Sequence, residues 1–368
     1  MCSSVVAYAH EHTSFFFRPS LQLYEKKKNR IIMKLLNTIT RLALPTLLAA
    51  MTVTACSSDD NGDGNNAPAE KNENRNSAYP DIAATRTEVP KLQGGNSKFI
   101  VYRTSDRSFD KDGVNYCVEW DRDLKANRWS CYILTKKNVQ GNGQRWKGDY
   151  SLPETSESSS YFFDLKNLTI NDYFHYKYNG GEFCYIHKAK SLGKKIDHGH
   201  LCNSQDRIYN NEINKQTFYI TNMQPQYKVF NGSDPKHKYK GLWLTMENTV
   251  HNLTSKLASD DTLFICKGGT IDRADQILMR VDNDKMIIPK YFYAAVVWKH
   301  TKNNIYAGIA FWFEHKDEYH GDDALKPYAI SIAELEKKLG GKIDFFCNLP
   351  DKIEKEMKSK AAIAGFGL

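Results

Sequence analysis

The stretch that decides the fold lies between residues 197 and 231. It reads, in chain order, Asp197-His198-Gly199-His200-Leu201, then Thr221-Asn222-Met223-Gln224-Pro225-Gln226, and finally a lone asparagine at position 231. A histidine therefore stands at the end of a predicted strand, an asparagine-rich loop follows, and a second asparagine precedes a helical stretch. A helix packed against such a strand end can hold the histidine and the asparagine close together.

His200 is the candidate general base and Asn231 is the candidate metal ligand. A neutral imidazole, with a pKa near ~6.5, accepts a proton from water at neutral pH. An amide oxygen suits Mg²⁺, which prefers oxygen ligands and keeps several of its waters. The alternatives are a structural histidine and a turn at Asn231-Gly232. A base for water and an oxygen for a hard cation are the parts that phosphodiester hydrolysis requires.

This region resembles the active site of the DNA/RNA non-specific endonucleases, which are ββα-metal (His-Me finger) enzymes related to endonuclease G. In that family an Asp-Arg-Gly-His motif precedes an Asn-x-x-Pro-Gln block, and a metal-binding Asn follows nine residues after the first Asn. Asn222 and Asn231 have this separation, and Gly241-Leu242-Trp243 with Glu247 match the next motif after a polar insertion. The resemblance covers roughly residues 97–360. Further similar segments are 118–121, 129–132, 288–293 and 331–336.

The resemblance implies an α+β fold, with a central antiparallel sheet flanked by helices and a ββα-metal motif. It also implies a Mg²⁺-dependent endonuclease, with Mn²⁺ as a substitute ion, that cleaves DNA and RNA to 5′-phosphorylated products. In this comparison Glu247 orients the waters of the metal, Asn222 hydrogen-bonds near the base, and Arg145 binds phosphate. The alternative for Glu247 and for Arg145 is a solvated surface residue. The alternative for Asn222 is a residue that shapes a loop.

Two histidines depart from the family pattern, which has arginine at the positions of His198 and His251. Histidine holds phosphate only when protonated, so binding by these residues should weaken as the pH rises through roughly 6.5. Glu247 shares a helix face with His251 and is expected to raise its pKa. The departures are the reason to consider an alternative, a catalytically weak nuclease-fold lipoprotein that binds extracellular nucleic acid. A structural lipoprotein with incidental histidines is a further alternative.

A zinc site is a competing interpretation of the same motif. His198, His200 and Cys202 alternate along the chain, so on a strand their side chains would point to one side. Imidazole and thiolate are the ligands that zinc prefers in proteins. No fourth ligand is evident in the sequence, and the nuclease resemblance accounts for more residues.

The N-terminal residues 1–55 are predicted to lie outside the fold, as a mistranslated leader ahead of Met33 followed by a lipoprotein signal peptide. The apolar run 42–55 follows two basic residues and is too short to span a bilayer. It ends in Val53-Thr54-Ala55-Cys56, which predicts lipidation of Cys56; an ordinary secretory signal is the alternative. Residues 56–95 are predicted to form a polar tether and residues 96–368 the nuclease domain. The protein should therefore be exported and held at the outer membrane or cell surface.

The net charge of the chain limits how it can bind nucleic acid. Residues 1–55 hold seven basic and two acidic residues, so their removal lowers the net charge from +8 to +3. Affinity for nucleic acid must then come from a local basic patch.

Six cysteines lie in the domain, which is compatible with up to three disulfides in an exported protein or with buried free thiols. They are residues 117, 131, 184, 202, 266 and 347.

Strands and helices are predicted to intersperse along the domain. β-branched and aromatic residues concentrate in six segments that we predict as strands. These are 99–102, 116–120, 129–134, 263–266, 291–298 and 305–313. Helical spacing predicts helices over 241–257, 331–339 and 351–358, the second with Ser331 and Glu334 as a capping box.

Overall fold

The computed structural model describes residues 71–124, 126–148, 196–234, 239–281, 286–319 and 324–368. The predictions for Met33, the signal peptide, Cys56 and Cys184 lie outside these ranges. No helix among the described residues has the length and apolar character to cross a membrane.

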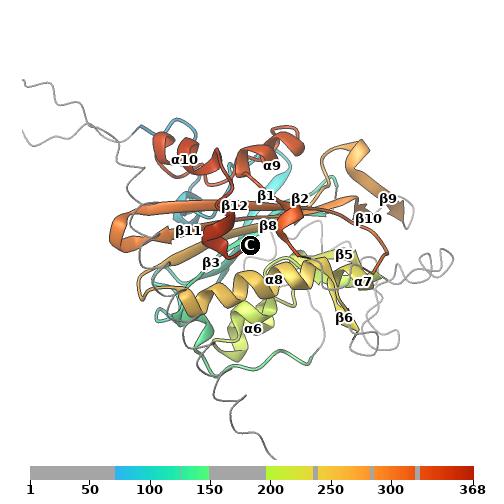
Figure 1. Cartoon of the computed structure of the whole chain (residues 1–368), viewed down its shortest axis with the longest axis horizontal. Coiled ribbons are helices and arrows are strands. Elements are labelled where there is room, and N and C mark those ends of the chain that lie inside the picture. The colour runs from blue at the N-terminus through green and yellow to red at the C-terminus, as the bar shows by residue number, and fades with distance from the viewer. Residues whose placement is uncertain (1–70, 125, 149–195, 235–238, 282–285, 320–323) are drawn as a thin grey trace, which may run out of the picture. The chain divides into compact units, whose positions relative to one another are not determined.

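A seven-stranded antiparallel sheet is the centre of the described domain (Figure 1), with the spatial order β1-β2-β3-β8-β11-β12-β13. Its strands are β1 (Ser97–Arg103), β2 (Val114–Asp121), β3 (Ala126–Leu134), β8 (Thr262–Gly269), β11 (Tyr291–His300), β12 (Ile305–Glu314) and β13 (Ala329–Ile330). All six predicted strands are present, because each is long enough for period-two alternation to fix its two faces.

Each face of the sheet packs on its own hydrophobic core. On β2, Tyr116 and Val118 enter one core, while Cys117 between them enters the other. The first core includes Trp243 of helix α8 (Leu242–Asn252). The second includes Leu335 of helix α9 (Ile332–Lys338). Burial on both faces explains why the central strands carry few charged residues.

Two layers of helices and ribbons cover these faces. Figure 1 shows α9 and α10 (Asp351–Lys358) on one side of the sheet, and α6 (Asn211–Gln216), α7 (Lys228–Asn231) and α8 on the other. Three two-stranded ribbons complete the description. They are β4 (Ile196–His200) with β5 (Met223–Tyr227), β6 (Ser233–Asp234) with β7 (Tyr239–Lys240), and β9 (Ile277–Val281) with β10 (Met286–Pro289).

Short 3-10 helices connect many of these elements. They are η2 (Ile82–Thr85), η3 (Lys137–Val139), η4 (Ser204–Arg207), η5 (Ile220–Asn222), η6 (Leu253–Lys256), η7 (Ala274–Gln276), η8 (Thr301–Asn303), η9 (Lys326–Tyr328) and η10 (Ile363–Phe366). The predicted helix 241–257 is therefore shorter than expected, because α8 ends at Asn252 and its last turn tightens into η6.

The boundary predicted at residue 96 is also wrong, because residues 71–95 belong to the fold. Ala84 and Val89 are fully buried in the second core. The buried Asn76 side chain donates to the carbonyls of Ala84 and Pro90, at 3.1 and 2.9 Å. The polar composition of this segment predicted a tether, yet its polar groups satisfy backbone atoms inside the domain.

Candidate active site

His200 is the last residue of β4, where it is held on three sides. β4 pairs with β5 so that His200 lies opposite Met223. The indole nitrogen of Trp243 donates to the His200 carbonyl at 3.2 Å, and the imidazole meets the Phe218 ring edge-on at 4.8 Å. The Gln226 side chain packs directly on Gly199, where a Cβ would lie 2.2 Å from Cδ of Gln226. The residue is buried, so its ring has a fixed place in the site.

The surroundings of His200 keep its imidazole neutral. Burial lowers the pKa of His200 well below its ordinary value, and the positive charges of Arg145, His198 and Lys267 lower it further. A neutral imidazole can accept a proton, whereas an imidazolium cannot. The environment therefore gives His200 the protonation state that a general base needs at neutral pH.

Asn222 anchors the loop that follows His200. Its Oδ1 accepts from the Cys202 amide at 2.7 Å and from the Ser130 hydroxyl at 3.0 Å. Its Nδ2 donates to the carbonyls of Cys202 and Thr217, each at 2.9 Å. The side chain is fully buried. These contacts favour a role in fixing the site over direct contact with a substrate.

Glu247 lies on the buried face of α8, one turn after Trp243, and forms an ion pair with a residue that the sequence did not single out. Nζ of Lys267, from β8, is 2.6 Å from Oε1 of Glu247. Burial raises the pKa of Glu247, the charge of Asp206 adds to this, and Lys267 and Arg145 oppose it. Glu247 is therefore not the solvated glutamate that a surface helix would carry.

Asn231 ends α7, which follows directly after β5. This short helix packs against β4, β5 and α8, so it lies among the elements that carry His200 and Glu247. Gly241, the N-cap of α8, permits this approach, because a Cβ there would lie 2.1 Å from the Phe230 carbonyl oxygen. Asn231 itself is half-buried, leaving part of its surface open to solvent.

His251 lies one turn beyond Glu247 and is paired with a buried carboxylate. Its Nδ1 is 2.8 Å from Oδ1 of Asp206, and Oδ2 of the same carboxylate accepts from the Tyr132 hydroxyl at 2.8 Å. This hydrogen bond to Asp206 raises the pKa of His251, against an opposing effect of burial. The predicted direction is confirmed, but the predicted cause is wrong, since Asp206 and not Glu247 is the partner.

Arg145 and His198 lie beside His200. The Arg145 guanidinium donates to Oγ of Ser204 at 2.8 Å and lies 5.0 Å from the centre of the Phe218 ring, which also contacts His200. The rings of His198 and His200 are 6.3 Å apart. The fold therefore brings two of the three predicted phosphate-binding residues, Arg145 and His198, to the end of β4.

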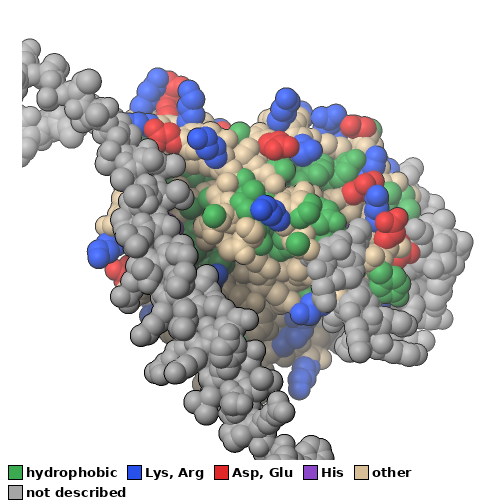
Figure 2. Space-filling view, in the orientation of Figure 1, with side chains coloured by type: hydrophobic (Ala, Val, Ile, Leu, Met, Phe, Trp, Pro, Cys, Tyr) green, Lys and Arg blue, Asp and Glu red, His purple; other side chains and the backbone are tan. Residues whose placement is uncertain are grey.

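The positive charge at this site is local. Arg145, His198 and Lys267 all act on His200, although the net charge of the chain is modest. By contrast, Figure 2 shows basic and acidic side chains interspersed over α9 and α10. Three cations therefore act on His200 at the end of β4, whereas charges of both signs alternate over these two helices.

The zinc interpretation has no support in the described part of the chain. Cys202 lies beyond β4 and is fully buried. Burial raises the pKa of the Cys202 thiol to about 12, as expected of a cysteine packed in the core. Within the described ranges, no three His, Cys, Asp or Glu side chains form a group that could hold a metal ion.

Of the two alternatives for the cysteines, disulfides or buried free thiols, the structure shows the second for the five cysteines that it describes. All five are free and buried; they are Cys117, Cys131, Cys202, Cys266 and Cys347. The first two face each other across β2 and β3, and Cys131 also faces Cys266 on β8. Burial raises the pKa of the Cys131 and Cys266 thiols well above the ordinary value, which suppresses the thiolate that disulfide exchange needs.

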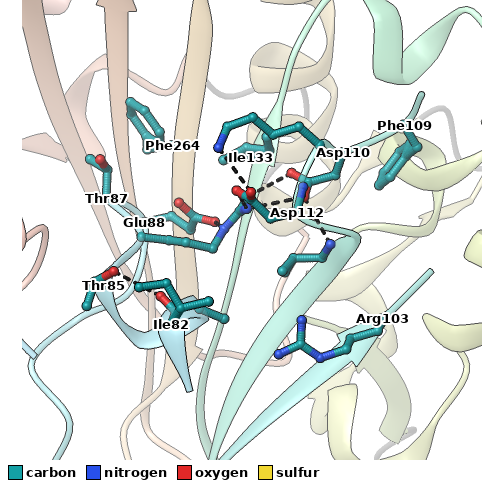
Figure 3. A pocket seen from close by; sticks show the side chains of 14 residues that line it. Ile82, Thr85, Thr87, Glu88, Arg103, Phe109, Asp110, Asp112, Ile133 and Phe264 are labelled. Carbon is teal, nitrogen blue, oxygen red and sulfur yellow. Dashed lines mark hydrogen bonds and ion pairs between the residues drawn. The ribbon is translucent and has the colours of Figure 1, made fainter. Parts of the chain in front are cut away.

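A pocket of about 500 Å³ lies elsewhere in the domain, and none of the predicted site residues lines it (Figure 3). Its central charge is already balanced. The Arg86 guanidinium is 2.6 Å from Glu88, 2.9 Å from Asp110 and 3.2 Å from Asp112. A cation paired with three carboxylates has little charge left for a ligand, so we place the chemistry at His200.

Comparison with known proteins supports the resemblance. The sequence model of the DNA/RNA non-specific endonucleases matches residues 99–352. No curated protein matches the chain. Among solved structures, the crystal structure of the EndoG/EndoGI complex is 18% identical with a TM-score of 0.46, covering 69% of this chain and 88% of that one. Because the family match spans well over half of the sequence, the chain belongs to the DNA/RNA non-specific endonuclease family and is a phosphodiester hydrolase.

Proposed function

We propose that this nuclease is Mg²⁺-dependent, with Mn²⁺ as a substitute, and that it cleaves both DNA and RNA to 5′-phosphorylated products. The observation that carries the proposal is the neutral, buried His200 at the end of β4, beside the ion pair of Glu247 and Lys267. The antiparallel β4–β5 pair followed by α7 and α8 is the arrangement expected of a ββα-metal motif.

His200 would take the proton of the water that attacks phosphorus in line with the departing 3′ oxygen. Arg145, and His198 when protonated, would hold the phosphate near the imidazole. Trp243 and Asn222 fix the backbone on either side of the base through the hydrogen bonds described above. The chain thus supplies a base, phosphate-binding cations and a rigid frame from separate elements.

The donor set fits a hard cation. Asn231 offers an amide oxygen on a half-buried surface, and Glu247 offers a carboxylate whose charge Lys267 balances. Neither group is a soft ligand of the kind that selects zinc. Asn231 would hold Mg²⁺, with Glu247 orienting its waters; the ion would stabilise the negative charge that develops on the phosphate and the departing oxygen.

Nicking of supercoiled plasmid and degradation of RNA test the proposal. We expect the purified protein to cleave both in Mg²⁺ and to stop when EDTA is added. Strong cleavage that survives EDTA would contradict the metal mechanism. Failure to cleave in Mg²⁺, Mn²⁺ and Ca²⁺ alike would support the alternative, a catalytically weak nuclease fold that binds extracellular nucleic acid.

Asn231→Ala is expected to raise the Mg²⁺ concentration needed for half-maximal cleavage by at least about tenfold. Loss of a residue that supports a bound metal typically weakens metal affinity by about 10–100-fold. The measurement is the rate of plasmid nicking against Mg²⁺ concentration. Asn304→Ala, at the β11–β12 turn, is the control. An unchanged Mg²⁺ requirement in Asn231→Ala would remove Asn231 from the metal site.

His251→Arg is expected to extend activity to higher pH. The imidazolium of His251, favoured by Asp206, is lost as the pH rises through its raised pKa, whereas arginine keeps its charge. His200 is neutral over this range, so it does not limit the alkaline side. The measurement is kcat/KM against pH for both proteins. Coincident profiles above neutrality would show that His251 does not contact phosphate.

We further propose that the protein is exported and that lipidated Cys56 anchors it to a membrane. The proposal rests on the Val53-Thr54-Ala55-Cys56 sequence and on the polar residues that follow it. Mass spectrometry of the mature N-terminus should find a diacylglyceryl-modified Cys56. An unmodified N-terminus at any other residue would rule out the anchor.

A further inference from the structure

Lys267 is a buried cation in the middle of the sheet. On β8 it lies opposite Ser130 of β3 and Ala294 of β11, so strands flank it on both sides. Only 2% of its surface is exposed. A lysine is almost never buried to this extent unless it is paired, because removing an ammonium from water is costly.

Its ammonium group is directed at the active-site helix. Nζ lies 2.6 Å from Oε1 of Glu247, 5.3 Å from the Trp243 ring and 5.6 Å from the Tyr132 ring. Trp243 also donates to the carbonyl of His200. One side chain therefore contacts both the carboxylate at the site and the aromatic residue that holds the backbone of the base.

The charges around Glu247 show why this contact matters. Burial and the charge of Asp206 both raise the pKa of Glu247, and Lys267 and Arg145 oppose them. Around His200, the charges of Arg145, His198 and Lys267 all favour the neutral ring. Lys267 thus favours an anionic Glu247 and a neutral His200 at the same time, which are the two states that the proposed reaction uses.

We propose that Lys267 is a positioning residue of this site, whose ammonium group fixes the Glu247 carboxylate and keeps it available to a hard cation. The inference rests on the proposed metal-dependent function. It assigns a role to a residue from a distant strand that touches Glu247 directly. Without Lys267, Glu247 would be a buried carboxylate beside Asp206, with Arg145 as the remaining opposing charge.

Lys267→Met tests the proposal by Mn²⁺ binding, measured calorimetrically without nucleic acid, and by cleavage kinetics. We expect the Kd for Mn²⁺ to rise about 10–100-fold and kcat to fall by a similar factor, as for loss of a residue that supports a metal site. KM for DNA should change little.

Lys358→Met is the matched control, because Lys358 is also buried and pairs with Glu336, Asp344 and Glu354 on the α10 side of the sheet. It should lose stability without a change in Mn²⁺ affinity. If Lys267→Met does not fold, Lys267→Gln keeps a donor without the charge and should show the same loss of affinity.

Wild-type Mn²⁺ affinity and kcat in Lys267→Met, or in Lys267→Gln, would overturn the proposal. Failure of the wild-type protein to cleave would instead count against the proposed function. The Mn²⁺ titration would still decide the role of Lys267 in that case, so the two failures can be told apart.

Discussion

Replacement of His200 by alanine is expected to lower kcat by about 10²–10⁴-fold, the usual contribution of a general base. DNA affinity should hardly change, because Arg145 and His198 remain in place. The fold should also persist, since Trp243 donates to the backbone carbonyl of His200 and not to its ring. The measurement is single-turnover cleavage at saturating Mg²⁺, with thermal unfolding recorded in parallel.

His300→Ala is the control for this variant. His300 ends β11, stacks on Trp298 and is paired with Asp261 at 3.5 Å, outside the set of residues that contact His200. It should cleave at the wild-type rate. A loss below tenfold in a folded His200→Ala protein would show that another group activates the water.

Arg128→Met is expected to have the largest effect on stability, lowering the free energy of unfolding by about 3–5 kcal/mol. Arg128 is buried on β3, where its guanidinium donates to Ser97 at 2.6 Å, Asp121 at 2.5 Å and Asp272 at 2.8 Å. Glu119 lies 3.5 Å away. Removing one arginine leaves three carboxylates without their shared cation, which is costlier than losing a solvated pair.

The loss of unfolding free energy in Arg128→Met should be larger at pH 8 than at pH 5. Burial raises the pKa of Glu119 to about 7, even though Arg128 opposes the shift. A carboxyl with a raised pKa stabilises the fold below its unfolded pKa and loses that contribution as the pH rises through about 7. Without Arg128 the shift should grow, so protonation at pH 5 offsets part of the damage.

Urea unfolding at pH 5 and pH 8 measures the unfolding free energy of Arg128→Met and of the wild type. Arg273→Met is the control. Arg273 pairs with Asp275 at 2.9 Å, but both side chains are well exposed. Exposed pairs contribute little, so this variant should unfold like the wild type. Equal losses in the two variants would mean that the buried Arg128 cluster is not a special source of stability.

Local pattern made much of the fold predictable. The six long strands and α10 are recognisable because alternation and helical spacing act between residues close in sequence. The N-terminal segment 71–95 was not predictable in this way. Asn72 and Asn74 bond to Leu349 and Asp344, more than 250 positions along the chain, and no local signal reports such partners.

The sequence by itself determined the family and the candidate base. The motif residues lie within one short segment of the chain, so their order and spacing can be recognised without a structure; they are His200, Asn222, Asn231 and Glu247. Only the tertiary structure decided which charges surround them. Lys267 meets Glu247 because β8 lies beneath α8, and Asp206 meets His251 because η4 approaches the same helix. Ion pairs of this kind depend on the packing of whole elements, so their partners are fixed by distance in space and not by separation along the chain.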